Sequence, residues 1–170
     1  MASLTTPRLH LRAARPGDAA ALHAVFSDAR AMRYWSTLPH TDADQTEAWL
    51  ASMIASPGNG ERDFLIEHEG RVIGKAGCWR PWEIGFILHP DDWGRGLARE
   101  AAAAVIGHIF AEHATEAIDA DVDPRNAASL RLLAGLGFTE TARVAATIQV
   151  GDEWCDSVYL RLTRTEHDRR

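Results

Sequence analysis

The sequence predicts one α/β domain, spanning residues 1–170 and built on a mixed sheet. Its 170 residues are enough for one sizeable core, and leave little room for a second domain. The 46% hydrophobic and 25% charged content is typical of a globular chain. Segments with apolar alternation and segments with helical spacing follow one another in the order β-α-α-β-β-β-α-β-α-β-β.

The N-terminal third predicts one strand and two helices. Apolar and polar residues alternate over residues 8–12, which indicates a strand. Asp18 opens the first helix, whose apolar residues recur at helical spacing. The second helix is expected to begin at Thr41, because Asp44 three residues later forms a variant of the capping box. It ends at residues 56–60, which are rich in turn formers.

The middle of the chain predicts a hairpin, a third strand and a helix. Residues 63–68 and 71–79 form the hairpin around Glu69-Gly70, since glycine accepts a positive φ. Residues 82–89 form a largely apolar strand. An apolar stripe then runs from Leu97 to Phe110, with many small residues that allow close packing on a sheet.

The C-terminal part predicts a strand, a helix and an antiparallel pair. Residues 117–122 form the strand, and residues 123–126 turn into a leucine-rich helix that Gly137 ends. Residues 138–150 and 153–162 then pair with each other. The exposed ends of such strands would allow a homodimer.

Composition narrows the possible functions. With 24 acidic and 18 basic residues, the formal charge of −6 gives no basic footprint for nucleic acid, and slightly favours a cationic partner. No secretory signal or membrane span is expected. Cys78 and Cys155 are expected to be free thiols in a reducing compartment, which indicates the cytoplasm. His108 and His113 miss the i, i+4 spacing of helical metal ligands, and no metal is expected.

The most informative segment is the glycine-containing junction at residues 93–98, between a strand and a helix. Gly94 and Gly96 let backbone N–H groups approach a ligand, and the helix start adds free donors and a positive dipole end. Together these features predict a phosphate site. A Rossmann fingerprint fails because its third glycine would fall at Arg99, and a P-loop fails because no G-K-S/T follows. The alternative is that the glycines only shape the turn.

What remains resembles the acetyl-CoA-binding signature Q/R-x-x-G-x-G/A of the GNAT acetyltransferases. Trp93 departs from it, but W-G-x-G-x-A is familiar in the RimJ/RimL-like branch, and Arg99-Glu100-Ala101 continues that likeness. Residues 126–138 resemble the family's N-x-x-S...G-F segment, so the matches span about residues 82–138. The resemblance implies acetyl-CoA as co-substrate, bound by Trp93, Gly94, Arg95, Gly96, Leu97, Ala98 and Asn126.

The resemblance also implies an N-acetyltransferase that acetylates a primary amine by direct attack in a ternary complex. A lysine-like amine, with a pKa near ~10.4, must first lose a proton to a base. Glu83 occupies the family position for that base, although it could instead be a strand-end carboxylate paired with Arg80. The strand would pair with the pantetheine arm, and the N–H of Ile87 or Leu88 would stabilise the oxyanion.

The remaining site residues concern the acid, the phosphate charge and the acceptor pocket. Many GNAT enzymes carry, at the position of Leu133, a tyrosine that protonates the departing CoA thiolate. Leucine cannot donate a proton, so Ser129 is the candidate substitute, and protonation by water is the alternative. Arg95 and Arg99 are candidates for neutralising phosphate, while Glu100 favours the helix N-terminus. Candidate acceptor residues, each of which could instead be core packing, are Arg33, Tyr34, Trp35 and Trp82, with His40 and Trp79.

Two functions of different classes stay open at this level. The first is the enzyme, whose acceptor is a protein N-terminal α-amine or a small-molecule amine such as an amino acid, a polyamine or an aminoglycoside. The second is a non-catalytic acyl-CoA-binding or sensing module, which the missing tyrosine at Leu133 keeps open. Retained Glu83 and Ser129 favour the enzyme. Fold alone cannot identify the acceptor.

Overall fold

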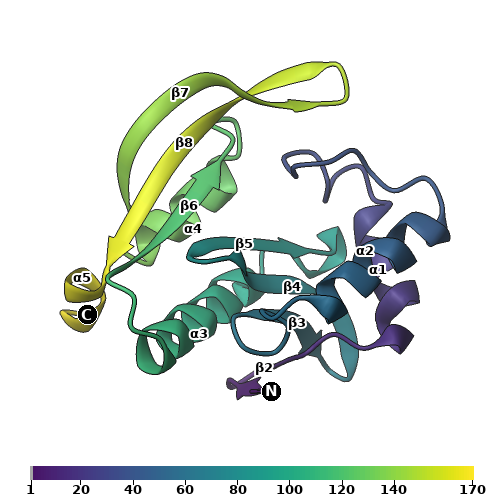
Figure 1. Cartoon of the computed structure of the whole chain (residues 1–170), viewed down its shortest axis with the longest axis horizontal. Helices are drawn as coiled ribbons and strands as arrows, with labels where there is room; N and C mark the ends of the chain where they lie inside the picture. Colours follow the sequence, from purple (N-terminus) through teal and green to yellow (C-terminus); the bar gives the residue numbers. More distant parts are fainter. Residues whose placement is uncertain (1) are drawn as a thin grey trace.

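Eight strands form one sheet, in the order β1-β2-β3-β4-β5-β6-β8-β7, in the computed structural model, which describes residues 2–170 (Figure 1). The strands are β1 (Leu4–Thr5), β2 (Leu9–Arg12), β3 (Asp63–His68), β4 (Arg71–Arg80), β5 (Glu83–Leu88), β6 (Ala117–Val122), β7 (Thr139–Val150) and β8 (Glu153–Thr163). The helices are α1 (Ala19–Phe26), α2 (Ala43–Ala55), α3 (Leu97–Glu112), α4 (Ala127–Gly135) and α5 (Arg164–Asp168), with short 3-10 turns at Pro16–Asp18 and Pro90–Asp92.

Helices cover both faces of the sheet, as the alternation of its strands requires. One face packs against α3 and α4 in the larger core cluster, which includes Ile84 and Leu88 of β5. Ile87, which directly precedes Leu88, packs instead with α1 and α2 in the second core cluster. Successive side chains of β5 therefore point into different layers. This placement confirms the predicted α/β architecture.

The sheet opens between β5 and β6. These two strands are parallel and pair at Glu83 and Asp119, whereas all other neighbouring strands within residues 2–170 are antiparallel. The Asp119 N–H donates to the Trp82 carbonyl oxygen at 2.8 Å, and no further register follows. Beyond this point the strands diverge, and the long β7–β8 hairpin curves away from the rest of the sheet (Figure 1). The divergence leaves the backbone edge of β5 open.

The structure confirms the predicted element order and corrects some details. It adds the short strand β1 and the C-terminal helix α5, which the sequence analysis did not predict. The expected capping box at Thr41 and Asp44 is wrong, because Asp42 is the N-cap of α2. Its carboxylate accepts the Gln45 N–H at 2.9 Å, and the Gln45 side chain accepts the Thr41 N–H at 2.8 Å.

Both cysteines are free, as predicted, and both are buried. Burial raises the pKa of the Cys78 thiol to about 12, so this side chain stays protonated and unreactive near neutral pH. Within residues 2–170, no helix has the length and apolar character needed to cross a membrane.

A buried ion pair anchors the start of α1. The Arg12 guanidinium donates to both carboxylate oxygens of Asp18, at 2.7 and 2.9 Å, and both side chains are less than a tenth exposed. Replacing one partner leaves the other charge buried. We expect Asp18→Asn to lower the free energy of unfolding by about 3 kcal/mol, near the low end for a broken buried pair, because Glu67 still pairs with Arg12. Chemical denaturation measures it.

The same pair gives a pH dependence with a definite sign. Burial alone would raise the pKa of Asp18, but hydrogen bonds from Arg12 and the Arg15 amide outweigh it and hold that pKa below its ordinary value. Its contribution is therefore present above the unfolded value near ~3.9 and is lost as pH falls through the lower folded value. The stability gap between wild type and Asp18→Asn should shrink below about pH 4. Glu140→Gln, which breaks an exposed pair with Arg143, serves as control and should cost much less.

Candidate active site

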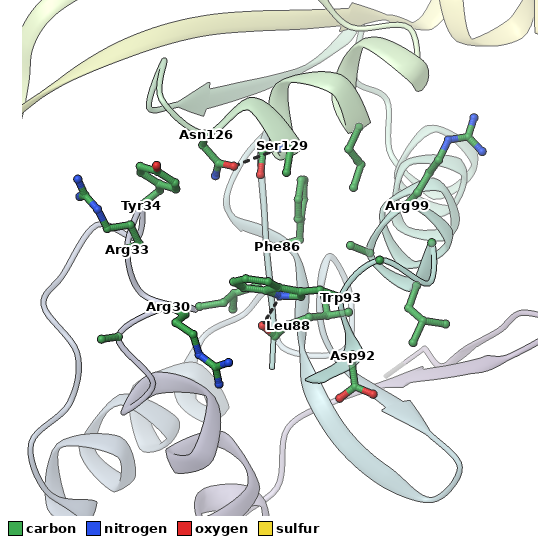
Figure 2. A pocket seen from close by; sticks show the side chains of 18 residues that line it. Arg30, Arg33, Tyr34, Phe86, Leu88, Asp92, Trp93, Arg99, Asn126 and Ser129 are labelled. Carbon is green, nitrogen blue, oxygen red and sulfur yellow. Dashed lines mark hydrogen bonds between the residues drawn. The ribbon is translucent and has the colours of Figure 1, made fainter. Parts of the chain in front are cut away.

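Two adjoining cavities lie where β5 and β6 diverge. The first has a volume of about 800 Å³ and the second about 610 Å³. The first extends along the end of β5 and the start of α3 (Figure 2), and the second extends toward β4, β6 and β8. The residues that line both cavities, and so form their common wall, are Arg33, Tyr34, Phe86, Asn126 and Ser129.

The glycine loop, residues 93–98, borders the first cavity. Gly94 and Gly96 have φ values of 71° and 76°, a left-handed conformation in which glycine avoids the usual Cβ penalty. Gly96 is the N-cap of α3, a helix of 16 residues, so free N–H groups and the positive dipole end meet there. Gly94, Gly96, Leu97 and Ala98 all line the cavity, which is the arrangement that an anion requires.

Trp93, the residue that departs from the family signature, covers the end of β5. Its indole Nε1 donates a hydrogen bond to the Leu88 carbonyl oxygen at 3.0 Å, as the dashed line in Figure 2 shows. The side chain is half exposed and lines the cavity. Trp93 thus satisfies a backbone acceptor on the edge that β6 leaves open.

The structure separates the two predicted backbone donors, Ile87 and Leu88. The His89 N–H donates to the Ile73 carbonyl oxygen of β4 at 2.8 Å. N–H groups two residues apart point to the same side of a strand, so the Ile87 N–H also faces β4. The Leu88 N–H faces the opposite, open edge, together with the carbonyl that Trp93 binds. Leu88 is therefore the better placed donor of the two.

The two arginines of the loop region behave differently. Arg99 lines the first cavity and donates to the Gly135 carbonyl oxygen at 3.3 Å. Arg95 does not line it, because its guanidinium turns to the buried Asp92 carboxylate at 3.4 Å. Asp92 also binds Arg71 at 3.1 Å. The Arg95 side chain is therefore not positioned for the expected phosphate contact in this structure.

Glu83 lines the second cavity, on the same face of β5 as Gly85. Its carboxylate is paired with the Arg80 guanidinium, at 2.8 and 3.0 Å, which is the alternative that the sequence left open. A second carboxylate, Asp121 of β6, lines the same cavity. Partial desolvation raises the pKa of Asp121 above its ordinary value, Ser157 opposes the rise through a hydrogen bond, and the Glu83 charge adds to it. Two carboxylates thus compete for the role of base.

Asn126 and Ser129 lie together at the start of α4. The Asn126 side-chain oxygen accepts the Ser129 N–H at 3.2 Å and caps the helix, which confirms the predicted cap (Figure 2). For the Ser129 hydroxyl, the structure of residues 2–170 records no hydrogen bond. That hydroxyl is therefore available to a ligand in the common wall. Leu133, at the position of the family's tyrosine, lines the second cavity.

The predicted acceptor residues divide into two groups. Arg33, Tyr34 and Trp35 line the second cavity, as does the largely exposed Trp79. Trp82 lies outside both cavities and packs on the His113 ring, with the ring centroids 4.8 Å apart. His40 lies outside the cavities too and contacts Phe26 and Thr46.

The C-terminal strands bring to the second cavity several carboxylates that were not predicted from the sequence. These are Asp121 and Asp123 from β6 and the following turn, with Glu153 and Asp156 from β8. The alternation Asp119-x-Asp121-x-Asp123 was a usable signal, since alternate residues of a strand share a face. In the part of the chain that the structure describes, no cluster of three or more His, Cys, Asp or Glu side chains is arranged to hold a metal.

Comparison with known proteins gives a consistent family. The model of the acetyltransferase (GNAT) domain matches residues 8–139. The uncharacterized N-acetyltransferase p20 of Bacillus licheniformis is 31% identical over 147 residues, which cover 81% of this chain and 83% of p20. The L-amino acid N-acyltransferase MnaT of Escherichia coli is 29% identical over 94% of this chain and 98% of its own length.

A solved structure carries the same fold. The ribosomal L7/L12 α-N-protein acetyltransferase RimL, in complex with coenzyme A, superposes with a TM-score of 0.81 over 95% of this chain and 97% of RimL. At 17% identity, this likeness concerns the fold alone. The family match over residues 8–139, supported by the relatives, gives the conclusion that this chain belongs to the GNAT family and is an acetyltransferase.

Proposed function

We propose that this protein transfers an acetyl group from acetyl-CoA to a primary amine of a small molecule, as an N-acetyltransferase with the RimJ/RimL-like loop sequence. The observation that carries the proposal is the common wall of the two cavities. One cavity has the anion-binding loop of residues 93–98, and the other has aromatic and acidic side chains. A donor and an acceptor bound in them would meet beside Phe86, Asn126 and Ser129.

The first cavity fits the donor. Gly94 and Gly96 supply backbone amides at the start of α3 for the pyrophosphate, and Arg99 supplies a positive charge in the same wall. The open edge of β5 at Leu88 offers backbone groups to an extended arm. Bound acetyl-CoA supplies the acetyl group as a thioester.

The protein's own groups can handle the protons of the transfer. Glu83 or Asp121 accepts the proton of the acceptor ammonium, so that the neutral amine can attack. The Leu88 N–H is positioned on the open edge as an oxyanion donor. As the C–N bond forms, the C–S bond of the thioester breaks and the CoA thiolate leaves. The Ser129 hydroxyl, in the common wall, is the proton donor that the protein offers to this thiolate in place of the absent tyrosine at Leu133.

The second cavity favours a small acceptor over a protein N-terminus. About 610 Å³ is within the range of ordinary small-molecule pockets. The cavity is walled by the segment at residues 33–36, by α2 and α4, and by β4, β5, β6, β7 and β8. MnaT, which is similar over nearly the whole chain, carries the name of an L-amino acid N-acyltransferase. RimL is named for a protein N-terminus, but its likeness is that of the fold.

Binding and turnover together test this function. We expect calorimetric titration to show that acetyl-CoA and CoA bind and NADH does not. A panel of amino acids, polyamines, aminoglycosides and one peptide with a free N-terminus is then assayed for release of free CoA thiol. Faster turnover of a small amine than of the peptide is the expected result. Peptide preference would reverse the acceptor assignment. CoA binding without turnover across the panel would favour the non-catalytic module.

A further inference from the structure

The tip of the N-terminal hairpin lies against the start of α3, next to the glycine loop. Thr6 and Leu9 close the turn between β1 and β2, with the Leu9 N–H donating to the Thr6 hydroxyl at 2.9 Å. Glu100 accepts the Thr6 hydroxyl at 2.6 Å and the Arg8 N–H at 3.0 Å. Arg8 and Glu100 are 92 positions apart in the sequence, so only the fold creates this contact.

The Arg8 side chain connects that carboxylate to the loop. Its Nε and Nη2 lie 2.7 and 2.6 Å from Oε2 of Glu100. Its Nη1 donates to the carbonyl oxygen of Arg95 at 2.8 Å. The guanidinium is planar, with its donors fixed relative to one another, so the bonds to Glu100 determine where Nη1 points. Burial alone would raise the pKa of Glu100, but hydrogen bonds from Thr6 and Arg8 outweigh it and keep the carboxylate ionised.

The Arg95 carbonyl belongs to the same peptide unit as the Gly96 N–H. In a trans peptide these two groups point in opposite directions. Gly96 accepts φ = 76° and could take other conformations as readily, so the glycine itself does not fix the orientation of this unit. A hydrogen-bond donor held on the Arg95 carbonyl oxygen does fix that orientation. Gly96 also lines the first cavity, whereas Arg8, which binds the Arg95 carbonyl, does not line it.

We propose that Arg8, held by Glu100, is a positioning residue that turns the Gly96 N–H toward the phosphate of the acyl donor. The inference rests on the proposed function, because it assigns the donor's pyrophosphate to this loop. Arg8 acts through the Arg95 carbonyl and does not itself line the first cavity. Its role is to orient a backbone amide, and its charge alone would not suffice.

Arg8→Lys separates orientation from charge. Lysine keeps the positive charge but has a single donor group, which cannot hold both Glu100 and the Arg95 carbonyl in a fixed fork. We expect Arg8→Lys and Glu100→Gln each to weaken CoA binding about tenfold, the effect of losing one hydrogen bond to a charged group. The KM for acetyl-CoA should rise with it, while kcat stays close to wild type. The double variant should bind CoA no more weakly than either single variant, because both substitutions break the same connection from Glu100 through Arg8 to the loop.

An acetyl donor that lacks phosphates distinguishes the positioning role of Arg8 from a merely structural role. With S-acetyl-N-acetylcysteamine, a thioester that lacks the pyrophosphate, wild type and both variants should have equal kcat/KM. Arg143→Lys, on the exposed face of β7, is the matched control and should match wild type with either donor. Its ion partner is also a glutamate, Glu140.

The outcomes are distinguishable. Wild-type CoA affinity in Arg8→Lys would overturn the positioning role, while the proposed function stands. Equal losses with the two thioesters would also overturn it, because general loosening of the fold would then be the cause. If wild type itself fails to bind CoA, the proposed function fails, and the positioning role fails with it.

Discussion

Replacing Gly96 with tryptophan is expected to abolish measurable CoA binding, with a Kd at least roughly 100-fold above that of wild type. A non-glycine residue at φ = 76° costs roughly 1–2 kcal/mol, which alone corresponds to about 5- to 30-fold in affinity if the loop changes shape to relieve it. The Cβ would also lie 3.5 Å from Nη2 of Arg8, in van der Waals contact, so the indole beyond it would compete with Arg8 and the phosphates for space beside the loop. Isothermal calorimetry measures the change.

A second glycine in the same region provides the control. Gly107 lies within α3 and has no positive φ, and beyond its own turn of helix no atom lies within 4 Å of the position that its Cβ would take. Gly107→Ala should bind CoA as wild type does and gain up to ~1 kcal/mol of stability, because alanine favours helix. Unchanged CoA affinity in the folded Gly96→Trp protein would show that the glycine loop does not hold the phosphates.

Replacing Glu83, the first of the two proposed bases, is expected to have the second largest effect. Glu83→Gln should lower kcat by about 10²-fold or more, the usual contribution of a general base, with CoA affinity unchanged. Glutamine keeps the size of the side chain but cannot accept the ammonium proton, and it loses the charge that pairs with Arg80. Steady-state kinetics with the best small amine measures kcat. Glu112→Gln, at the end of α3 and outside both cavities, is the control.

Asp121→Asn decides between the two carboxylates. If Asp121 is the base, this variant loses the activity and Glu83→Gln retains most of it. The acid limb of the pH profile would then lie above the ordinary aspartate range, because partial desolvation, followed by the Glu83 charge, raises the pKa of Asp121. A group with a raised pKa stays protonated to a higher pH, so the activity would fall earlier on acidification. Full activity in both variants would exclude both residues from the role.

Hydrophobic periodicity was enough to predict the order of the main elements. The stripe from Leu97 to Phe110 became α3, and the alternation around Gly151-Asp152 became the β7–β8 hairpin. Periodicity could not find β1, which has two residues, or α5, which has five, since neither is long enough to show a period. The start of α2 was missed because Thr41, Asp42 and Asp44 are all plausible caps, and only the hydrogen bond from the Gln45 N–H identifies Asp42.

The sequence by itself determined the α/β class, the glycine loop between a strand and a helix, and the position of Ser129 at the start of a helix. Each of these depends on residues that are close along the chain, where propensity and backbone geometry act directly. The tertiary structure decided which side chains face one another. Glu83 turned to Arg80, Arg95 turned to Asp92, and Trp82 packed outside the cavities.

The tertiary structure alone also brought Arg8 to the loop and the carboxylate of Asp121 beside Glu83. Such contacts join residues far apart in the chain, and they depend on how the strands diverge and on which charged partner is nearest. A local pattern carries no information about either, because the energy of an ion pair or a hydrogen bond is set by distance and burial in the folded molecule.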